Sequence, residues 1–235
     1  MSLLEVNAGT ADVWVYQYER DTTSRLTFGA ASNSRPVWTP DGLRIAFSSD
    51  RAKRNVDVMI LPMEGSETAG WKPGKPFAFL NGPRNEGLAQ FSPDGRWIAY
   101  VSDETGRFEV YVRPFPGPGG KWQISTNGGL WPMWSPKGGE LLYEEVRDSR
   151  IMLAAYTASG SSFQAEKPRP WASNSVSLVL NEIGGTPFDV SPDGKRLAVL
   201  LKAPDQTETA TREDHLTFLF NFTDELRRRV PQGKR

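Results

Sequence analysis

The chain has 235 residues with 28 basic and 28 acidic side chains, so its formal net charge is zero. Nucleic-acid-binding proteins usually carry a basic surplus, and this balance argues against that class. There is no cysteine, which excludes disulfides and thiol chemistry, and no apolar run approaches membrane-spanning length, so membrane insertion is not expected. The start, Met1–Glu5, is not expected to be a signal peptide because it lacks a basic region and an apolar core.

The first predicted strands lie near the N-terminus, at Asp12–Tyr16 and Ser24–Phe28. The earlier of the two opens with an acid that is followed by apolar residues. The same form recurs at Asp57–Leu61 and Glu109–Val112, which indicates one repeated strand with a shared structural hydrogen bond at its acid.

A short turn motif is repeated four times along the chain, at 38–42, 91–95, 134–138 and 190–194. Its second copy reads Phe-Ser-Pro-Asp-Gly. Proline presets the backbone of a tight turn, and glycine takes the position that favours a left-handed backbone. Each copy therefore predicts a hairpin between two strands.

The segments that follow the turns are apolar on both faces, as in Ile45-Ala46-Phe47 and Ile98-Ala99-Tyr100. Such runs are typical of strands buried between two neighbouring sheets. A fourth strand is expected at Lys75–Leu80 and at Lys121–Ser125. Two segments are expected to be surface loops, 64–76 and 203–214, and the one helix candidate is Thr223–Val230.

Four strands in each repeat of roughly 40 to 55 residues predict an all-β fold, a β-propeller of four-stranded antiparallel blades. The whole chain, 1–235, is expected to form one such domain with four or five blades. An open ring would leave strand edges exposed. We therefore expect the N-terminal strands to complete one blade together with the C-terminal strands at 187–190, 196–201 and 216–222. Assembly of two short rings is an alternative, and the oligomeric state stays open.

The chain resembles a known family. The Ser-Pro-Asp-Gly turns, the Ser-Asp pairs after the second strand (Ser49 and Asp50, Ser102 and Asp103) and the acid-led third strands are similar to TolB-type propeller repeats. The stretch Asn85–Gly129 resembles the propellers found C-terminal to membrane-anchored bacterial serine/threonine kinases. This resemblance implies a sensory or scaffolding propeller without catalysis of its own, and a periplasmic or extracytoplasmic location.

The candidate binding residues precede the first strand of each repeat, at the expected mouth of the central channel. They differ from repeat to repeat, whereas the turn and strand positions do not, so a ligand-specific surface can be formed there. The alternative is that they only fill the channel. They are Asn33, Ser34, Arg35, Asn85, Glu86, Leu130, Trp131 and Glu182.

Catalytic and metal motifs are weak. His215 is the only histidine, which makes neither a zinc site nor a triad by itself, and no Gly-x-Ser-x-Gly sequence occurs. Asp50, Asp103 and Glu104 could bind calcium, although capping of their turns explains them better. No other cofactor is expected.

Three functions remain open. A scaffold that binds a protein or peptide partner is favoured. A metal-dependent, lactonase-like hydrolase would use Asn33, Asn85 and Glu86, and an accessory sensor domain of a kinase or peptidase is the third.

Overall fold

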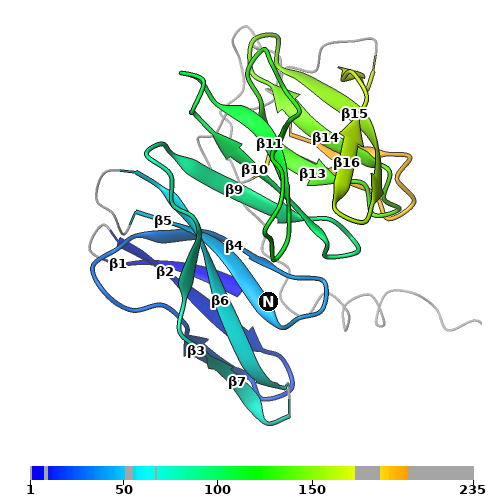
Figure 1. Cartoon of the computed structure of the whole chain (residues 1–235). Helices are drawn as coiled ribbons and strands as arrows, with labels where there is room; N and C mark the ends of the chain where they lie inside the picture. Colours follow the sequence, from blue (N-terminus) through cyan, green and yellow to red (C-terminus); the bar gives the residue numbers. More distant parts are fainter. Residues whose placement is uncertain (1, 8–9, 51–54, 67, 173–185, 201–235) are drawn as a thin grey trace, which may run out of the picture. The chain divides into compact units, whose positions relative to one another are not determined.

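The computed structural model describes residues 2–7, 10–50, 55–66, 68–172 and 186–200. All regular secondary structure within these residues is β-strand, as expected from the turn motifs, and the strands form five antiparallel sheets (Figure 1). In the same part of the chain, no helix has the length and apolarity needed to cross a membrane. The predictions for 203–214, 216–222, 223–230 and His215 fall outside the described residues.

The N-terminal sheet has three strands in the order β1-β2-β3. These are β1 (Ser2–Asn7), β2 (Thr10–Gln17) and β3 (Thr22–Arg25). The predicted strand at 12–16 lies in β2. The predicted strand at 24–28 overlaps β3 only at Ser24 and Arg25, because β3 begins and ends earlier in the chain. Strand β1 was not anticipated from the sequence.

The second sheet follows the order β4-β5-β6, after which β6 pairs with both β7 and β8 along different parts of its length. Its strands are β4 (Asn33–Trp38), β5 (Arg44–Ser49), β6 (Asp57–Ser66), β7 (Gly70–Pro73) and β8 (Phe77–Leu80). The third sheet has the regular four-stranded order. It contains β9 (Glu86–Phe91), β10 (Trp97–Ser102), β11 (Glu109–Pro114) and β12 (Trp122–Gln123).

The fourth sheet repeats the plan of the second, because β15 pairs with both β16 and β17. Its strands are β13 (Leu130–Trp134), β14 (Glu140–Glu145), β15 (Arg150–Ser159), β16 (Ser162–Ala165) and β17 (Arg169–Pro170). The fifth sheet is a hairpin of β18 (Phe188–Val190) and β19 (Leu197–Val199). Strands β4, β9, β13 and β18 are referred to below as the first strands of their sheets.

Every copy of the turn motif joins a first strand to the second, as predicted. In the second copy, Gly95 has a φ of 69° and donates its N–H to the Ser92 carbonyl at 2.9 Å. The Ser92 hydroxyl donates to Asp94 Oδ1 at 2.5 Å and accepts the Trp97 N–H at 3.0 Å. The serine and the aspartate thus close the hairpin through side-chain bonds.

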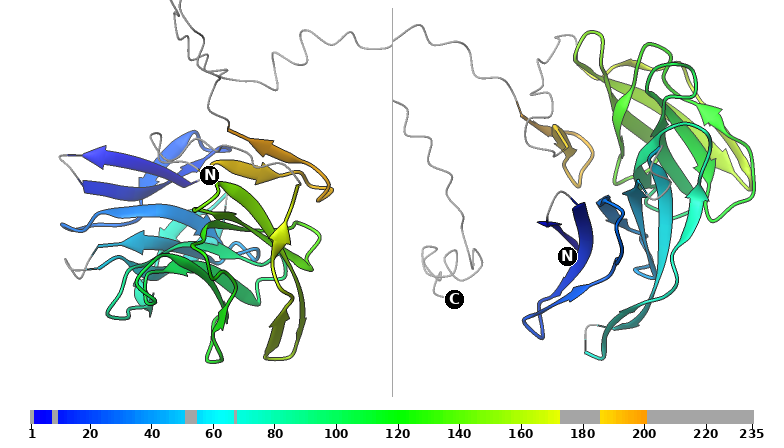
Figure 2. Two further views of the ribbon diagram at one scale, coloured as in Figure 1. Left: turned by 90° about the horizontal axis from the view of Figure 1, so that it is seen from above. Right: turned by 90° about the vertical axis from the view of Figure 1, so that its left-hand side faces the viewer.

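Consecutive sheets pack face to face (Figure 2). Each pair shares a buried apolar cluster. Strand β5 shows why: Ile45 and Phe47 pack against β2, whereas Ala46 lies in the cluster that reaches β10. None of these three side chains is exposed. Burial on both faces confirms the prediction for the strands after the turns, and it is the packing of propeller blades.

The expectation of a surface loop at 64–76 was wrong. Strand β6 continues to Ser66 and turns back as β7, so that most of this segment is a hairpin. A Cβ atom at Gly65 would lie 2.0 Å from the Gly70 carbonyl oxygen, which explains the glycine. The centre of the Trp71 ring on β7 lies 5.6 Å from that of Trp38 on β4, and this contact packs the hairpin against β4. A segment rich in Gly, Pro and Ser can thus form a β-hairpin, and this composition does not by itself predict a loop.

The expected composite blade is not seen in the described residues. The two edges of β2 pair with β1 and β3, so this strand has no free edge for a C-terminal strand. Strands β18 and β19 pair with each other. The predicted C-terminal strand at 216–222 lies outside the described residues, so closure of one blade by both termini and a single domain over 1–235 stay predictions.

Candidate functional site

The first strands of the second, third and fourth sheets share an irregularity at one position. In each, two residues lie opposite a single residue of the next strand, which makes a β-bulge. The first residue of each bulge has a positive φ although it is not glycine: 56° at Arg35, 52° at Leu88 and 55° at Trp131.

A left-handed backbone is unfavourable for such side chains, by about 1–3 kcal/mol for each residue. The same conformation occurs three times, with arginine, leucine and tryptophan in turn, so the blade imposes it whatever the side chain. Bulges also leave a residue out of the strand ladder, which suits Pro36 and Pro132 in the second position. The repeat thus holds three variable side chains at equivalent points of a common backbone.

The side chains of Arg35 and Trp131 meet although they come from the second and the fourth sheets. The guanidinium carbon of Arg35 lies 4.4 Å from the centre of the Trp131 ring, within the range of a cation–π contact. Burial lowers the pKa of Arg35, yet guanidinium stays charged in proteins. Within the described part of the chain, Arg35 has no hydrogen-bond or ion-pair partner, and the buried Trp131 Nε1 also has none.

Around this pair is a cavity of ≈ 470 Å³, here named the central cavity. Its lining includes Arg35, Glu86, Leu88, Phe108, Leu130 and Trp131. A second cavity of ≈ 520 Å³, the side cavity, shares Phe108 and Leu130 with it and extends to Arg147. A smaller space of ≈ 140 Å³ shares Arg35, Leu88 and Trp131 and reaches Thr186, which precedes β18.

Glu86 is a half-buried carboxylate in the central cavity. Its pKa is raised chiefly by burial, and Asp57 and Glu104 add to the effect through charge repulsion. The Gly82 N–H donates to Glu86 Oε2 at 2.9 Å and acts in the opposite direction. One carboxylate oxygen is therefore already used by the protein's own backbone.

The predicted binding residues thus divide into two groups. Ser34, Arg35, Asn85, Glu86, Leu130 and Trp131 all line the central cavity. Asn33 does not, because it is fully buried, where its side chain accepts from Ser49 Oγ at 2.8 Å and donates to the Ala31 carbonyl at 3.2 Å. Glu182 falls outside the described residues.

Asn85 lines the cavity, but its side chain is engaged within the fold. Its Nδ2 donates to Asp103 Oδ2 at 2.7 Å, and its Oδ1 accepts the Val56 N–H at 3.1 Å. The Asn85 N–H donates to the other oxygen of Asp103 at 2.9 Å. Asn85 therefore ties the start of β9 to the neighbouring loops.

Sequence reasoning missed Leu88 and Phe108. Leu88 could have been found, because it stands three residues before Phe91, just as Arg35 precedes Trp38 and Trp131 precedes Trp134. No repeated pattern marks Phe108, which lies in the loop before β11 and is 44% exposed.

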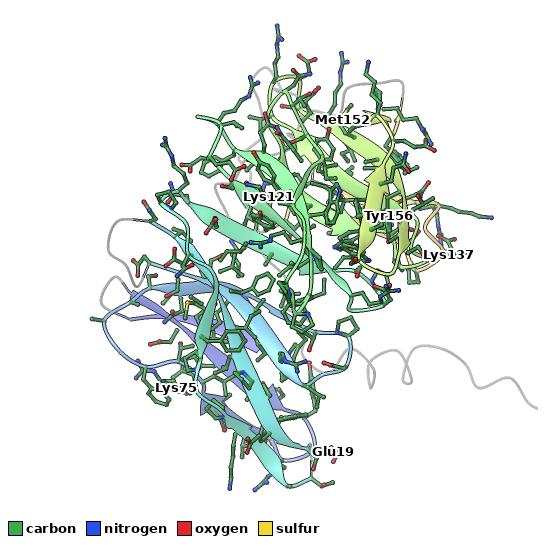
Figure 3. All side chains as sticks on the ribbon, viewed as in Figure 1. Glu19, Lys75, Lys121, Lys137, Met152 and Tyr156 are labelled. Atoms are coloured by element: carbon green, nitrogen blue, oxygen red, sulfur yellow. The ribbon has the colours of Figure 1, made fainter. Side chains whose placement is uncertain are left out.

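The acidic residues weighed for metal binding have other contacts. Asp50 accepts the Ser32 N–H at 2.6 Å, and Asp103 accepts the Asn85 N–H at 2.9 Å, so each bonds to a residue at or just before a first strand and not to its own turn. Glu104 accepts from Lys121 Nζ at 2.6 Å, and Lys121 is labelled in Figure 3. Among the residues that the structure describes, no group of three or more histidine, aspartate or glutamate side chains could hold a metal ion. Asn33 and Asn85, which the hydrolase hypothesis would use, are engaged in separate networks.

The acid that opens the third strand does make a repeated bond. Thr27 Oγ1 donates to Asp12 Oδ1 at 2.7 Å and accepts the Val13 N–H at 2.9 Å. Ser125 makes the same two bonds, donating to Glu109 and accepting the Val110 N–H at 2.8 Å. Asp12 and Glu109 are therefore structural, as the repeat indicated, whereas Asp57, the third acid of the pattern, makes no such bond among the described residues.

No family model matches the sequence. A stretch of 63 residues is 32% identical to the uncharacterized peptidase YuxL of Bacillus subtilis (strain 168), and it amounts to 27% of this chain and 10% of that protein. This similarity covers too little of either protein to transfer an activity.

Solved structures show more extensive similarity. TolB from Acinetobacter baumannii has a TM-score of 0.57 at 17% identity, covering 87% of this chain and 47% of that one. A putative TolB from Agrobacterium tumefaciens has a TM-score of 0.52 at 18% identity, covering 70% and 59%. A puromycin-hydrolyzing peptidase of Mycobacterium tuberculosis has a TM-score of 0.54 at 20% identity, covering 84% and 34%. The chain spans less than two thirds of each, and the likeness confirms the propeller fold.

Proposed function

We propose that this TolB-like β-propeller repeat protein is a non-catalytic scaffold that binds a segment of a protein partner in the central cavity. The observation that supports this most is the set of three left-handed residues, Arg35, Leu88 and Trp131, at equivalent bulges. A strained backbone that recurs with different side chains holds a variable surface on a rigid frame.

The lining of the cavity suits a peptide. Its wall combines the apolar side chains of Leu88, Phe108 and Leu130 with the polar groups of Arg35 and Glu86. Ligand sites in proteins are concave and largely apolar, with a few polar groups that fix orientation. Tryptophan and arginine are also frequent anchors of protein interfaces.

Hydrolysis has less support. A metal-dependent site needs carboxylates or amides that converge on an open position. Asn85 instead bonds to Asp103, and Glu86 accepts the Gly82 N–H. Glu86 and Asn85 are thus committed to neighbouring loops.

The binding proposal can be tested with a matched pair of phenylalanines. Phe108 lines the cavity and is 44% exposed, whereas Phe77 lies on β8, outside the cavity lining, and is 46% exposed. Peptides selected by display against the whole protein should bind Phe108→Ala at least about tenfold more weakly, a loss of ~1.4 kcal/mol, and bind Phe77→Ala as they bind the wild type.

Failure to select any peptide, or equal binding to both variants, would contradict the proposal. The same preparation should be assayed with a panel of lactones and esters with added divalent cations. Turnover faster than about 1 s⁻¹ would favour the hydrolase instead.

A further inference from the structure

The central cavity contains a cation that the protein does not neutralise. Arg35 is half-buried, and within the described residues its charged group contacts the face of Trp131, 4.4 Å from the ring centre. Among the described residues it has neither a hydrogen-bond acceptor nor an ion-pair partner. A guanidinium carries five N–H donors, and withdrawing them from water without acceptors is unfavourable.

The two acids that line the central and side cavities, Glu86 and Asp103, already accept hydrogen bonds from the protein. Both oxygens of Asp103 accept hydrogen bonds from Asn85, and Glu86 accepts the Gly82 N–H. Burial raises the pKa of Glu86, because the cavity disfavours the charged form of this acid. Neither acid is an ion-pair partner of Arg35 among the described residues.

The stacking of Arg35 also fixes what it can bind. A guanidinium that lies on an aromatic ring keeps its planar edge free, and that edge matches a carboxylate with two parallel hydrogen bonds. Lysine would offer a point charge without this geometry. The contact with Trp131 therefore prepares the group for a planar, negatively charged acceptor.

A second cavity lies next to the one that holds Arg35. The side cavity shares Phe108 and Leu130 with the central cavity, and it is also lined by Arg147. Arg147, like Arg35, has no partner among the described residues, whereas Arg107 beside it bonds to Glu109 and to the Thr126 carbonyl. Both spaces thus offer apolar walls with an unpaired arginine.

We propose, as a refinement that rests on the proposed function, that the bound segment is an extended acidic peptide. An aspartate or glutamate side chain within the segment pairs with Arg35, and a neighbouring apolar side chain lies against Phe108. The segment runs on into the side cavity towards Arg147, so the carboxylate comes from a side chain and not from the end of the chain.

The test uses the selected peptides, acetylated and amidated so that they have no terminal charge, and measures their affinity by fluorescence polarisation. The glutamate form of a peptide should bind the wild type at least about tenfold more tightly than the glutamine form. In Arg35→Gln this ratio should fall close to one. Arg169→Gln, an exposed substitution on β17 with the same change in charge, should keep the full ratio.

Arg35→Lys separates geometry from charge, and it should restore only part of the ratio because lysine lacks the planar edge. A ratio near one in the wild type, or a ratio that Arg35→Gln leaves unchanged, would overturn the inference of an acidic peptide. Binding that still depends on Phe108 would in that case support the proposed scaffold function on its own. Peptides that need only a free terminal carboxylate, or a phosphorylated residue in place of the acid, would also overturn it. If neither the glutamate nor the glutamine form of the peptides bound the wild type, the proposed function itself would be refuted.

Discussion

Arg35 and Trp131 are in contact although they belong to the first strands of two sheets that are not consecutive in the chain. Their groups lie 4.4 Å apart, and Leu88, at the equivalent position of the intervening sheet, lines the same cavity. Three equivalent points of the repeat therefore converge. The β-bulge that brings these residues together also imposes their positive φ, and the resulting backbone strain can be measured.

The strain at Arg35 should appear in the stability of substituted proteins. Arg35→Gly should change the free energy of unfolding by less than about 1 kcal/mol, because relief of the positive φ offsets the lost cation–π contact. Arg35→Val should be less stable than Arg35→Gly by ~1–3 kcal/mol, since a β-branched residue resists this backbone. Urea unfolding measures both, and equal stabilities would contradict the bulge geometry.

The serine of the turn motif should contribute more stability where the motif is complete. Ser92 is fully buried and bonds to Asp94 and to the Trp97 N–H, so Ser92→Ala should cost about 1–3 kcal/mol. In the third copy Lys137 replaces the aspartate (labelled in Figure 3), and no side-chain bond is recorded for Ser135 in the described residues. Ser135→Ala is the control and should cost less than half as much in thermal unfolding.

The N-terminal sheet should be required for a soluble protein. Val13, Val15 and Leu26 cover Ile45 and Phe47 of the second sheet. Burying each aliphatic side chain contributes about 1.5–3 kcal/mol, so deletion of Met1–Phe28 should cost several kcal/mol and expose this apolar face of the second sheet. Size-exclusion chromatography should show aggregation, and a soluble truncated protein with an unchanged melting temperature would contradict the packing.

Glu144 should make stability depend on pH. It has no exposed surface, and neither carboxylate oxygen has a hydrogen-bond partner among the described residues. Burial raises its pKa above the unfolded value, so the protonated acid is the form that the fold accepts. Stability is thus greatest below the unfolded pKa, about 4.5, and is lost as pH rises from there through the folded pKa.

The substitution Glu144→Gln removes the titrating group and keeps its shape. It should raise the melting temperature by about 2 °C or more at pH 7 to 8, and the gain should shrink towards zero near pH 4. Glu140, which is partly exposed at the start of the same strand, provides the control Glu140→Gln. A gain that does not vary with pH would show that Glu144 is not an uncompensated buried acid.

The sequence by itself determined the hairpins and the strands buried on both faces. The turn at Ser92–Gly95 depends on the chemistry of adjacent residues: proline presets the backbone, glycine accepts a positive φ, and serine and aspartate close the hairpin. Ile45 and Ala46 alternate faces because side chains of a strand point to opposite sides. Such local rules operate over a few residues, which is why they can be recognised in the sequence.

Only the tertiary structure decided which variable residues are free to bind. In the sequence, Asn33 and Asn85 are candidate binding residues just as Arg35 is. In the fold, the side chains of both asparagines are engaged in hydrogen bonds to residues 16 and 18 positions away in the chain. Packing of the sheets against one another creates the contact of Arg35 with Trp131 and the two cavities that share Phe108 in their lining. Distances between residues remote in the chain are set by that packing, and no pattern within a single repeat encodes them.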